Sequence, residues 1–377
     1  MNEINLYKIR GTGNTTFNYY FDKITSVFIK SKIHEIDYPK KVMFVRNDHI
    51  GDMALTTQVY KEFKNAFPKS NITVLASPGN KTLIEKDLNV DNIIEIDLFW
   101  RRGFKGFLDY LKVLKKIKEE KFDIGIDIRR SKLNILFFLF IPKIKTRISY
   151  YNINGGKAFL THPIVYEKKI GGIKEDPEMI SKAFKIELKD YMPYIAISKE
   201  DENEVKNFLK KNEVKNFIDI APGATANSKR WPEEKFDKII ELIHKKYPKY
   251  KIILSGANSD KELIGRLCEN REKICVPLIN MNLRQMSIIY KKAKVVVANN
   301  GAGTDITGVV NGNLIHLAGP VTLIIDKPLG NTKILHHQLP CYPCKWDQEC
   351  AKPHGQWCMD LISVDEVMDA VDEFVRK

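Results

Sequence analysis

The sequence contains no run of apolar residues long enough to cross a lipid bilayer, which takes about 18–20 such residues in a helix. The longest apolar run is ILFFLFI at residues 135–141, and its length predicts a buried strand or helix instead. The N-terminal segment MNEINLYKIRGTGNTTFNYY has neither the apolar core nor the small-residue cleavage site of a secretory signal peptide. Together these absences predict a cytoplasmic protein.

Cysteine and arginine are both scarce. Six cysteines in 377 residues argue against a fold held together by disulfides, because cytosolic thiols stay reduced. There are 61 basic and 47 acidic residues, which give a formal net charge of +14, and lysine greatly outnumbers arginine. This excess favours anionic partners such as nucleic acid, anionic lipid headgroups or phosphorylated small molecules, although a lysine-rich solvated surface has the same composition. Lysine suits diffuse charge better than the bidentate recognition of bases.

Strand and helix patterns alternate through most of the chain. A hydrophobic content of 44% is a globular value, and 377 residues are enough for two domains. Strands separated by helices predict parallel βαβ units with right-handed crossovers. Residues 151–200 are less regular, and the alternation restarts after them. The predicted strands are 41–46, 71–77, 92–97, 122–128, 251–257 and 313–319, and segments 216–223 and 294–303 are each predicted as a strand followed by a turn. The predicted helices are 54–67, 80–88, 107–121, 233–247, 261–270, 283–293 and 363–377.

The two alternating halves predict an α/β protein with two doubly wound domains, residues 41–190 and 191–377, that face a central cleft. Residues 1–40 are basic and aromatic with weak periodicity, and we expect them to form an extension packed on the first domain. A helix that lies on a membrane surface is the alternative for this extension.

Three polar turns follow three of the predicted strands. They are RNDHIGDM at 46–53, APGATANSKRWPEE at 221–234 and NNGAGTD at 299–305. Ligands of open α/β sheets bind at the carboxyl ends of the strands. Glycine-bearing turns that open a helix suit phosphate, although most such turns are structural. The sequence has neither a GxGxxG fingerprint nor a Walker A lysine, so dinucleotide and P-loop binding lack support.

Six segments stand out in this order: VRNDHIGDMALTT, FDIGIDIR, APGATANSKRWPEEKF, LSGANSDKEL, NNGAGTD and the cysteine-rich tail that begins with CYPC. Together they resemble glycosyltransferase family 9, the ADP-heptose:lipopolysaccharide heptosyltransferases, over roughly residues 40–377. The most specific pieces are the G-D pair at 51–52, the K-x-W-P motif at 229–232 and the glycine turn at 300–303. The resemblance implies a GT-B fold, in which two Rossmann-like domains bind the acceptor and the nucleotide-sugar respectively.

The turn after the first predicted strand carries the candidate catalytic base. In the family, the aspartate that follows the glycine of this turn deprotonates the acceptor hydroxyl, and the resemblance assigns that role to Asp52, which follows Gly51. Direct displacement at an anomeric carbon requires one general base, unlike the paired carboxylates of a glycosidase. The alternative is that Asp52 is the N-cap of the helix that follows.

The resemblance assigns donor binding to the second domain. Lys229 matches the lysine that contacts the donor diphosphate, where its charge would stabilise the leaving group without a metal. A surface lysine beside a helix start is the alternative. Gly223 and Ala224 would bring backbone donors near the ligand. Asp260 matches the acidic residue that binds the nucleotide ribose, or else it caps the helix that follows.

The third turn departs from the family pattern of an aspartate, a serine or threonine, a glycine, two further residues and a histidine. Here two asparagines precede the glycine, and the histidine position falls on Thr304 or Asp305. Amides and a hydroxyl can still donate to phosphate, whereas an aspartate repels diphosphate unless it faces a sugar hydroxyl. Because of this departure, the resemblance does not determine which sugar and which nucleotide the donor contains. The candidate donor-binding residues of this turn are Asn300, Gly301, Ala302, Gly303, Thr304 and Asp305.

The tail CYPCKWDQECAKPHGQWC contains four cysteines, two of them with C-x2-C spacing. Four thiols could hold tetrahedral zinc or iron, and such a metal would be structural because four thiolates leave no open coordination position. A subset of the family related to protein heptosyltransferases resembles an iron-binding finger here, whereas the alternative is a set of reduced, partly buried cysteines. No cofactor is expected for catalysis. The candidate metal ligands are Cys341, Cys344, Cys350 and Cys358.

The resemblance therefore predicts an inverting glycosyltransferase that moves a heptose, or a related sugar, from an ADP-sugar to a hydroxyl of a lipopolysaccharide-core-type acceptor. The positive surface would hold this enzyme at the inner leaflet of the membrane, near phosphorylated acceptor lipid. One alternative keeps the fold and changes the acceptor to a protein or a capsular glycan. The other is a non-enzymatic nucleotide- or nucleic-acid-binding module, whereas the transferase prediction expects no nucleic-acid partner.

Overall fold

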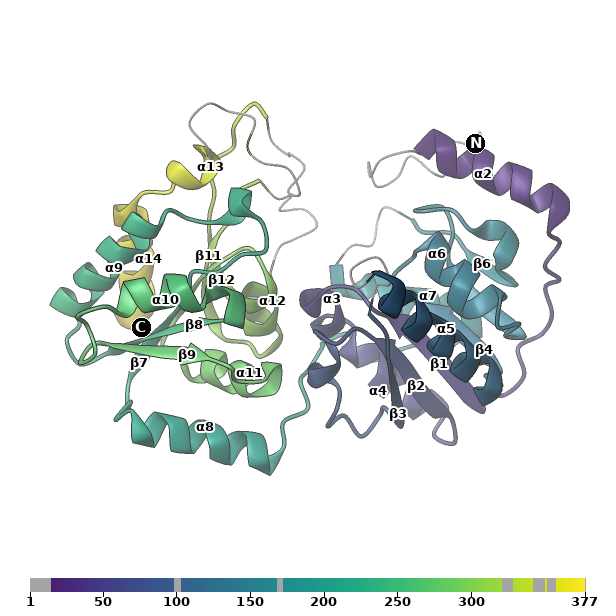
Figure 1. The fold of residues 1–377 in the computed structure, drawn as a ribbon, viewed down its shortest axis with the longest axis horizontal. Coiled ribbons are helices and arrows are strands. Elements are labelled where there is room, and N and C mark those ends of the chain that lie inside the picture. The colour runs from purple at the N-terminus through teal and green to yellow at the C-terminus, as the bar shows by residue number, and fades with distance from the viewer. Residues whose placement is uncertain are drawn as a thin grey trace. The chain divides into compact units, whose positions relative to one another are not determined.

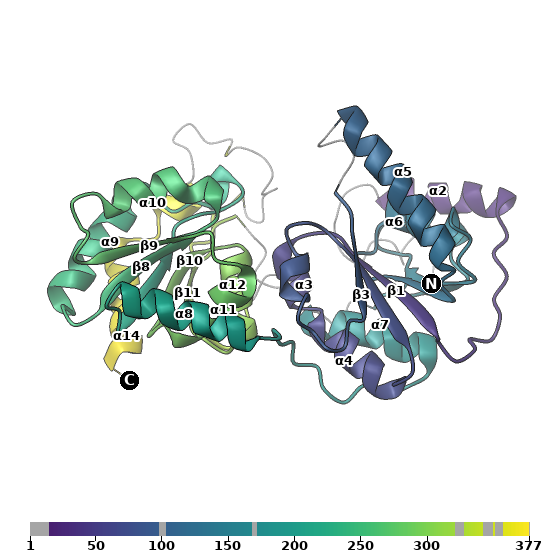
Figure 2. The ribbon, with the colours of Figure 1, turned by 60° about the horizontal axis from the view of Figure 1, so that its bottom comes forward.

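A computed structural model describes residues 15–97, 103–167, 172–320, 328–341, 350 and 357–376. The chain divides into two compact units, Met1–Pro193 and Tyr194–Lys377 (Figure 1). Each unit contains its own six-stranded sheet, and helices lie on both faces of each sheet (Figure 2). Within the described residues, no helix combines the length and the apolarity that a membrane span needs.

The sheet of unit 1 is parallel throughout, with the strand order β3-β2-β1-β4-β5-β6. The central strand β1 is a continuous buried apolar run because the sheet is covered on both faces. This order is that of a Rossmann sheet, whose direction of winding reverses between β1 and β4. The strands are β1 (Lys41–Arg46), β2 (Asn71–Ala76), β3 (Asn92–Glu95), β4 (Ile124–Asp127), β5 (Thr146–Tyr150) and β6 (His162–Ile164).

Helices pack on both faces of this sheet. On one face, the ring of Phe44 in β1 meets the rings of Tyr60 and Phe63 in α4, with centroids 5.5 and 5.2 Å away. On the other face, α5 and η3 pack on apolar side chains of β1, β2 and β3. The ILFFLFI segment forms η3, so it is a helix and not a strand. The helices are α2 (Thr15–Phe28), α3 (Ile50–Ala54), α4 (Thr57–Ala66), η1 (Lys81–Leu83), α5 (Gly103–Glu120), α6 (Lys132–Asn134), η3 (Ile135–Phe140), η4 (Lys157–Phe159), η5 (Gly172–Lys174) and α7 (Glu175–Phe184).

The predicted helix over 80–88 is wrong. Only the short η1 forms there, because the side chain of Asn80 competes with helical hydrogen bonds at the start of the segment. The Oδ1 atom of Asn80 accepts from the N–H of Ser77 at 2.9 Å, and its Nδ2 donates to the carbonyl of Arg46 at 3.0 Å. At the other end, Asp87 Oδ1 accepts from the N–H of Asn89 at 2.9 Å and forms a local turn.

The helix predicted over 54–67 is α4, which begins at Thr57, and the separate short helix α3 (Ile50–Ala54) precedes it. The carbonyl of Asp52 accepts from the side chains of Arg46 and Thr56. The N–H of Thr56 instead donates to the carbonyl of Met53 at 3.1 Å, so the regular spacing of helical bonds is lost at this point.

The sheet of unit 2 has the order β12-β11-β10-β7-β8-β9, and it is also parallel throughout. Counted from β7, this is the same Rossmann order, with the reversal between β7 and β10. The strands are β7 (Phe217–Ala221), β8 (Lys251–Gly256), β9 (Cys275–Ile279), β10 (Val296–Asn299), β11 (Asn313–Leu317) and β12 (Asn331–Leu335).

An apolar core of unit 2 lies under α9, α10 and α14, where Trp231, Phe236 and Phe374 pack against side chains of the sheet. On the opposite face, α11 carries Tyr290, whose hydroxyl lies 3.4 Å from that of Ser255 in β8. The helices are α8 (Lys199–Lys211), η6 (Asn227–Lys229), α9 (Glu233–Lys246), η7 (Asn258–Asp260), α10 (Lys261–Cys268), α11 (Leu283–Lys292), α12 (Ala302–Val309), α13 (Trp357–Asp360) and α14 (Val364–Arg376).

Candidate catalytic and donor-binding residues

Arg46, the last residue of β1, fixes the turn that carries Asp52. Its buried guanidinium donates from Nε and Nη2 to the backbone carbonyl of Asp52, at 3.2 and 2.9 Å. Its Nη1 donates to the carbonyl of Ile128, just beyond β4, at 3.4 Å. One side chain therefore connects the turns after β1 and β4, at the point where the winding of the sheet reverses.

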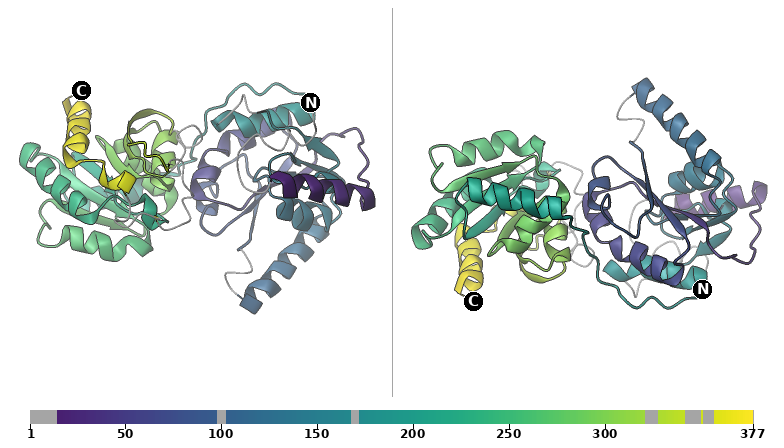
Figure 3. Two further views of the ribbon diagram at one scale, coloured as in Figure 1. Left: turned by 90° about the horizontal axis from the view of Figure 1, so that it is seen from above. Right: turned by 90° about the horizontal axis from the view of Figure 1, so that it is seen from below.

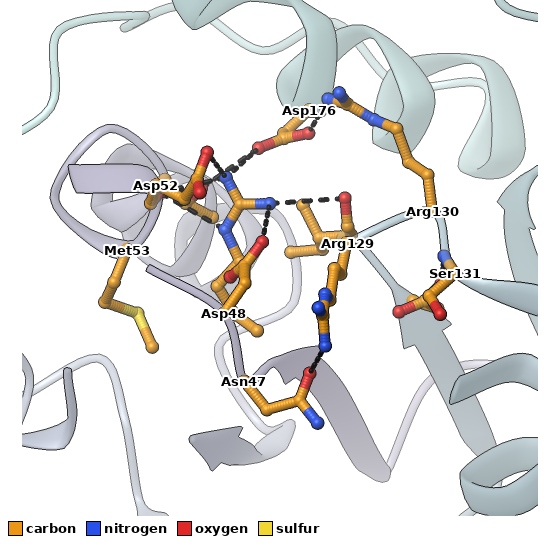
Figure 4. A network of polar contacts seen from close by, with 12 residues as sticks. Asn47, Asp48, Asp52, Met53, Arg129, Arg130, Ser131 and Asp176 are labelled. Atoms are coloured by element: carbon orange, nitrogen blue, oxygen red, sulfur yellow. Dashed lines mark hydrogen bonds and ion pairs between the residues drawn. The ribbon is translucent and has the colours of Figure 1, made fainter. Parts of the chain in front are cut away.

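Three carboxylates surround this guanidinium (Figure 4). Arg46 Nη1 lies 3.5 Å from Asp48 Oδ2. The Nη2 atom lies 3.5 Å from Asp52 Oδ1 and 3.7 Å from Asp176 Oδ2. The side chains of Asp48 and Asp176 are 9% and 8% exposed, whereas that of Asp52 is 43% exposed. Among the three, Asp52 is therefore the carboxylate that a hydroxyl arriving from solvent can reach.

Burial and neighbouring charges together set the pKa values of the groups around Asp52. Burial alone would lower the pKa of Arg46, but the neighbouring carboxylates raise it above its ordinary value, so Arg46 remains a cation. Burial raises the pKa of Asp48, against the lowering effect of Arg46. Burial also raises the pKa of Asp127 to about 7, although the Ser131 N–H donates to its carboxylate at 2.7 Å. Because Asp127 is fully buried, no substrate can reach it, and its contacts are structural.

The alternative role of Asp52 as an N-cap is wrong. The N-cap position of α3 is His49. Asp52 lies in the first turn of this helix and directly follows the buried Gly51. For Asp52 to be the N-cap, the helix would have to begin at residue 53, but it begins at Ile50. An acidic group in a first turn still interacts favourably with the helix dipole, although α3 is too short for a large effect.

A second arginine fixes α7 against this network, and the sequence analysis did not identify it. Arg130 Nη1 lies 2.7 Å from Glu175 Oε2, and its Nη2 pairs with Asp176. Asp176 also accepts from the hydroxyl of Thr56 at 3.0 Å. The sequence offers one indication of these two arginines, which is their position at strand ends. Arg46 ends a predicted strand, and Arg130 follows another predicted strand closely. Their acidic partners on α7 lie more than forty residues further along the chain, and no local pattern identifies them.

In unit 2, the structure brings the second and third predicted turns together. Lys229 Nζ donates to Asn300 Oδ1 at 2.8 Å. The buried Asn299 strengthens the contact between the turns: its Oδ1 accepts from the Trp231 N–H at 3.0 Å, and its Nδ2 donates to the Pro222 carbonyl at 2.7 Å. The two turns meet because they follow β7 and β10, which are neighbours in the sheet.

His316 in β11 extends this contact, and no sequence pattern had identified it. Its Nε2 lies 3.4 Å from Asn300 Nδ2. Burial, with a smaller effect of the Lys229 cation, lowers the pKa of His316 to about 4, so the imidazole is neutral at pH 7. A neutral Nε2 can accept from the Asn300 amide, which leaves the amide oxygen facing Lys229.

Gly223 and Ala224 lie in a tightly packed turn. A Cβ atom at position 223 would collide with the carboxylate of Asp260, so this close approach requires glycine. Asp260 lies at the N-cap position of α10, but its side chain makes no capping hydrogen bond to that helix. Its Oδ2 instead accepts from the N–H of Ala257, which precedes the helix, at 3.0 Å. The Ala224 carbonyl accepts from the guanidinium of Arg230 at 2.9 and 3.1 Å.

The remaining residues of the third turn form the start of α12. Gly301 is the N-cap, and the Thr304 hydroxyl donates to its carbonyl at 2.6 Å. Thr304 is 1% exposed, so its hydroxyl serves the turn itself. Ala302, Gly303 and Asp305 are partly exposed on the first turn of the helix.

The cysteine-rich tail is described only in part. Cys341 is exposed, Cys350 and Cys358 are partly buried, and Cys344 lies outside the described residues. Among the residues that the structure describes, no three His, Cys, Asp or Glu side chains are grouped so as to hold a metal ion. A metal bound by the four tail cysteines therefore stays a prediction.

Comparisons with known proteins match most of the chain. The family model for glycosyltransferase family 9 (heptosyltransferase) matches residues 110–354. Lipooligosaccharide heptosyltransferase 2 of Haemophilus influenzae is 26% identical over 308 residues, which are 77% of this chain and 86% of that protein.

Two solved structures have a similar fold. The Escherichia coli ADP-heptose lipopolysaccharide heptosyltransferase II is 17% identical, with a TM-score of 0.70 over 89% of this chain and 98% of the other. The E. coli heptosyltransferase WaaC with ADP-2-deoxy-2-fluoro heptose is 16% identical, with a TM-score of 0.67 over 88% and 99% of the two chains. With the two parallel Rossmann-order sheets, these similarities confirm the predicted GT-B fold class.

Proposed function

The chain belongs to glycosyltransferase family 9 and is a glycosyltransferase, and from this premise we propose that it transfers a heptose, or a related sugar, from an ADP-sugar to a hydroxyl of a lipopolysaccharide-core-type acceptor. The names of the similar heptosyltransferases support this choice of sugar and acceptor, and the ADP-sugar analogue named with one similar structure supports the donor. In this proposal residues 41–190 bind the acceptor and residues 191–377 bind the donor.

The contact between Lys229 and Asn300 is the observation that carries the proposal. It places an ammonium group and an amide side by side at the carboxyl ends of β7 and β10, where parallel sheets bind their ligands. A diphosphate oxygen can replace the amide oxygen as the partner of Lys229, and the hydrogen bond then becomes charge-assisted on both sides. The amide of Asn300 and the first turn of α12 provide further donors for phosphate.

The proposed reaction is a single displacement. Asp52 takes the proton of the acceptor hydroxyl, and the oxygen attacks the anomeric carbon from the face opposite the diphosphate. The bond between that carbon and the diphosphate oxygen breaks, so the configuration inverts and ADP departs. Lys229 stabilises the negative charge that builds on the departing diphosphate, so the proposal requires no metal or other cofactor.

Two experiments test this proposal with purified protein. Thermal-shift titrations with ADP, GDP and UDP identify the nucleotide, because a specific ligand raises the melting temperature in a saturable way. Mass spectrometry then detects transfer from ADP-heptose to a core oligosaccharide that lacks heptose. Saturable stabilisation by ADP and a product heavier by one heptose support the proposal. Transfer only to a protein or a capsular glycan overturns the acceptor assignment, and binding only to oligonucleotides, weakened by salt, overturns the enzyme assignment.

The proposal locates the enzyme in the cytoplasm, at the inner leaflet of the membrane. The formal charge of +14 supports an anionic surface as a partner. The alkyl chains of a lipid-linked acceptor stay in the bilayer, so the enzyme must come to the membrane surface to reach the glycan.

A further inference from the structure

Helix α2 is attached to unit 1 through both apolar and polar residues. Tyr19 and Phe21 pack on an apolar cluster of unit 1, and the ring centroid of Phe21 lies 6.3 Å from that of Phe159. Asp22 is 3% exposed, and its Oδ1 accepts from the N–H groups of Gly156 and Lys157 at 2.6 and 3.1 Å. Asn18 is 4% exposed, and its Oδ1 accepts from Lys132 Nζ at 2.9 Å. These bonds fix which side of the helix faces the rest of unit 1.

The opposite side of α2 is apolar and exposed. A helix on the surface of a globular domain ordinarily turns its apolar stripe inward and its polar face outward. In α2, the inward side carries the buried polar residues Asn18 and Asp22 beside Tyr19 and Phe21, whereas four large apolar residues at helical spacing are exposed on the other side. Figure 3 shows the helix on the outside of unit 1. The four outward residues are Tyr20 (51%), Ile24 (60%), Val27 (67%) and Phe28 (81%), whereas the ring of Phe17 lies against Lys132 of unit 1, with its centroid 4.5 Å from the Nζ atom.

Lysines lie beside this apolar face. Lys23, Lys30 and Lys32 are exposed, and Ile33 next to them is 76% exposed. The one acidic residue between positions 15 and 34 is Asp22, which is buried against unit 1. The exposed part of this segment is therefore apolar and cationic, with no exposed carboxylate.

We propose that the outward face of α2 docks on an anionic lipid bilayer. The apolar side chains would enter the boundary between headgroups and acyl chains, and the lysines would meet lipid phosphates, which strengthens binding about fivefold for each lysine. A second copy of the chain fits the same face less well, because a two-fold contact would place like-charged lysines together. The inference rests on the proposed function in one respect: α2 belongs to the unit proposed to bind a lipid-linked acceptor.

Vesicle co-sedimentation of the full chain tests the proposal. We expect binding to vesicles of phosphatidylglycerol and phosphatidylcholine in equal parts, and much weaker binding to phosphatidylcholine alone. The double variant Ile24→Glu/Val27→Glu should lose at least about tenfold in partitioning, since it places two carboxylates at the headgroups. Leu88→Glu is the matched control, because Leu88 is 94% exposed in the same unit but outside α2, and it should bind as the wild type does.

The double variant should keep the melting temperature and the rate of transfer to a lipid-free oligosaccharide acceptor, because both replaced side chains are exposed and lie outside the proposed catalytic residues. Equal vesicle binding by wild type and double variant would overturn the proposal. So would light scattering in which the double variant converts a dimer to a monomer, an outcome that assigns the face to a second copy. Vesicle binding without transfer to any acceptor would refute the proposed function and leave the docking surface standing.

Discussion

Replacing Asp52 by asparagine separates a catalytic role from a structural one. The turn is fixed by the backbone carbonyl of Asp52, which accepts from Arg46 at 2.9 and 3.2 Å and from the Thr56 hydroxyl at 2.8 Å. Asp52→Asn leaves these three bonds in place and keeps the shape of the side chain. What the variant loses is the basicity of the carboxylate.

The magnitudes of the two effects differ widely. The carboxylate lies 3.5 Å from the Arg46 guanidinium and is 43% exposed, so water screens this ion pair. Such a pair contributes at most about 1 kcal/mol to the free energy of unfolding. Arg46 also keeps Asp48 and Asp176 as partners, so no buried charge is left alone. A general base contributes roughly 10²- to 10⁴-fold to the rate, and we expect turnover to fall by that factor.

Initial rates at saturating donor, urea denaturation and the thermal shift with ADP measure turnover, stability and donor binding separately. Asp190→Asn is the matched control: Asp190 is in the same unit, its side chain is 40% exposed, and it pairs with Lys61 at 3.0 Å. This control should transfer sugar at the wild-type rate. Near-normal turnover by a folded Asp52→Asn protein that binds ADP would refute Asp52 as the base.

Three further predictions concern unit 2 and the tail. Lys229→Ala should weaken ADP binding, measured by calorimetry, and slow transfer by about 10²-fold. The control Lys238→Ala, at an exposed lysine, should change neither quantity. Equal ADP affinities of the wild type and Lys229→Ala would show that Lys229 is only a surface residue. Burial raises the pKa of Asp219 to about 8. Between pH 4 and 8 the unfolded chain therefore loses a proton that the folded chain keeps, and stability falls as the pH rises. In urea denaturation at pH 5 and 8, Asp219→Asn should reduce this fall, and an unchanged difference would contradict the reasoning. If the four tail cysteines bind a structural metal, elemental analysis should find about one zinc or iron per chain. A metal-free protein that is folded and active would refute this metal site. The cysteines concerned are Cys341, Cys344, Cys350 and Cys358.

The central strands and the edge strand β3 were predictable from the sequence, but four other strands at or next to the sheet edges were not. Strands that are covered on both faces, or almost completely, consist of apolar runs bounded by polar turns, which the sequence reveals. These strands are β1, β2, β4, β7, β8, β10 and β11. The strands absent from the prediction, β5, β6, β9 and β12, lie at or next to the edges. Pro163 in β6 and Pro277 in β9 weaken the pattern, and the sequence NTKIL of β12 is largely polar.

The candidate site could be predicted in parts but not as an arrangement. The sequence identified Lys229 and Asn300 as members of two separate turns, and their contact depends on β7 and β10 being neighbours in the sheet. Strand order is a property of the whole unit, which local patterns do not contain. The same limit applies to Asp176, which reaches Arg46 from a helix near the end of unit 1.

The turn after β1 shows why the sequence left Asp52 open between a base and a cap. Both interpretations place an aspartate shortly before an apolar helix, and they differ only in where that helix begins. Because α3 already begins at Ile50, the carboxylate of Asp52 has no cap to supply, and within the described chain its contact is the screened ion pair with Arg46. Asp52→Ala should therefore cost less than the roughly 1 kcal/mol of a lost cap. If Asp52→Ala and Asp52→Asn are both stable and both inactive, the carboxylate acts in the chemistry; a stability loss confined to Asp52→Ala, with normal turnover in both, would restore the structural role.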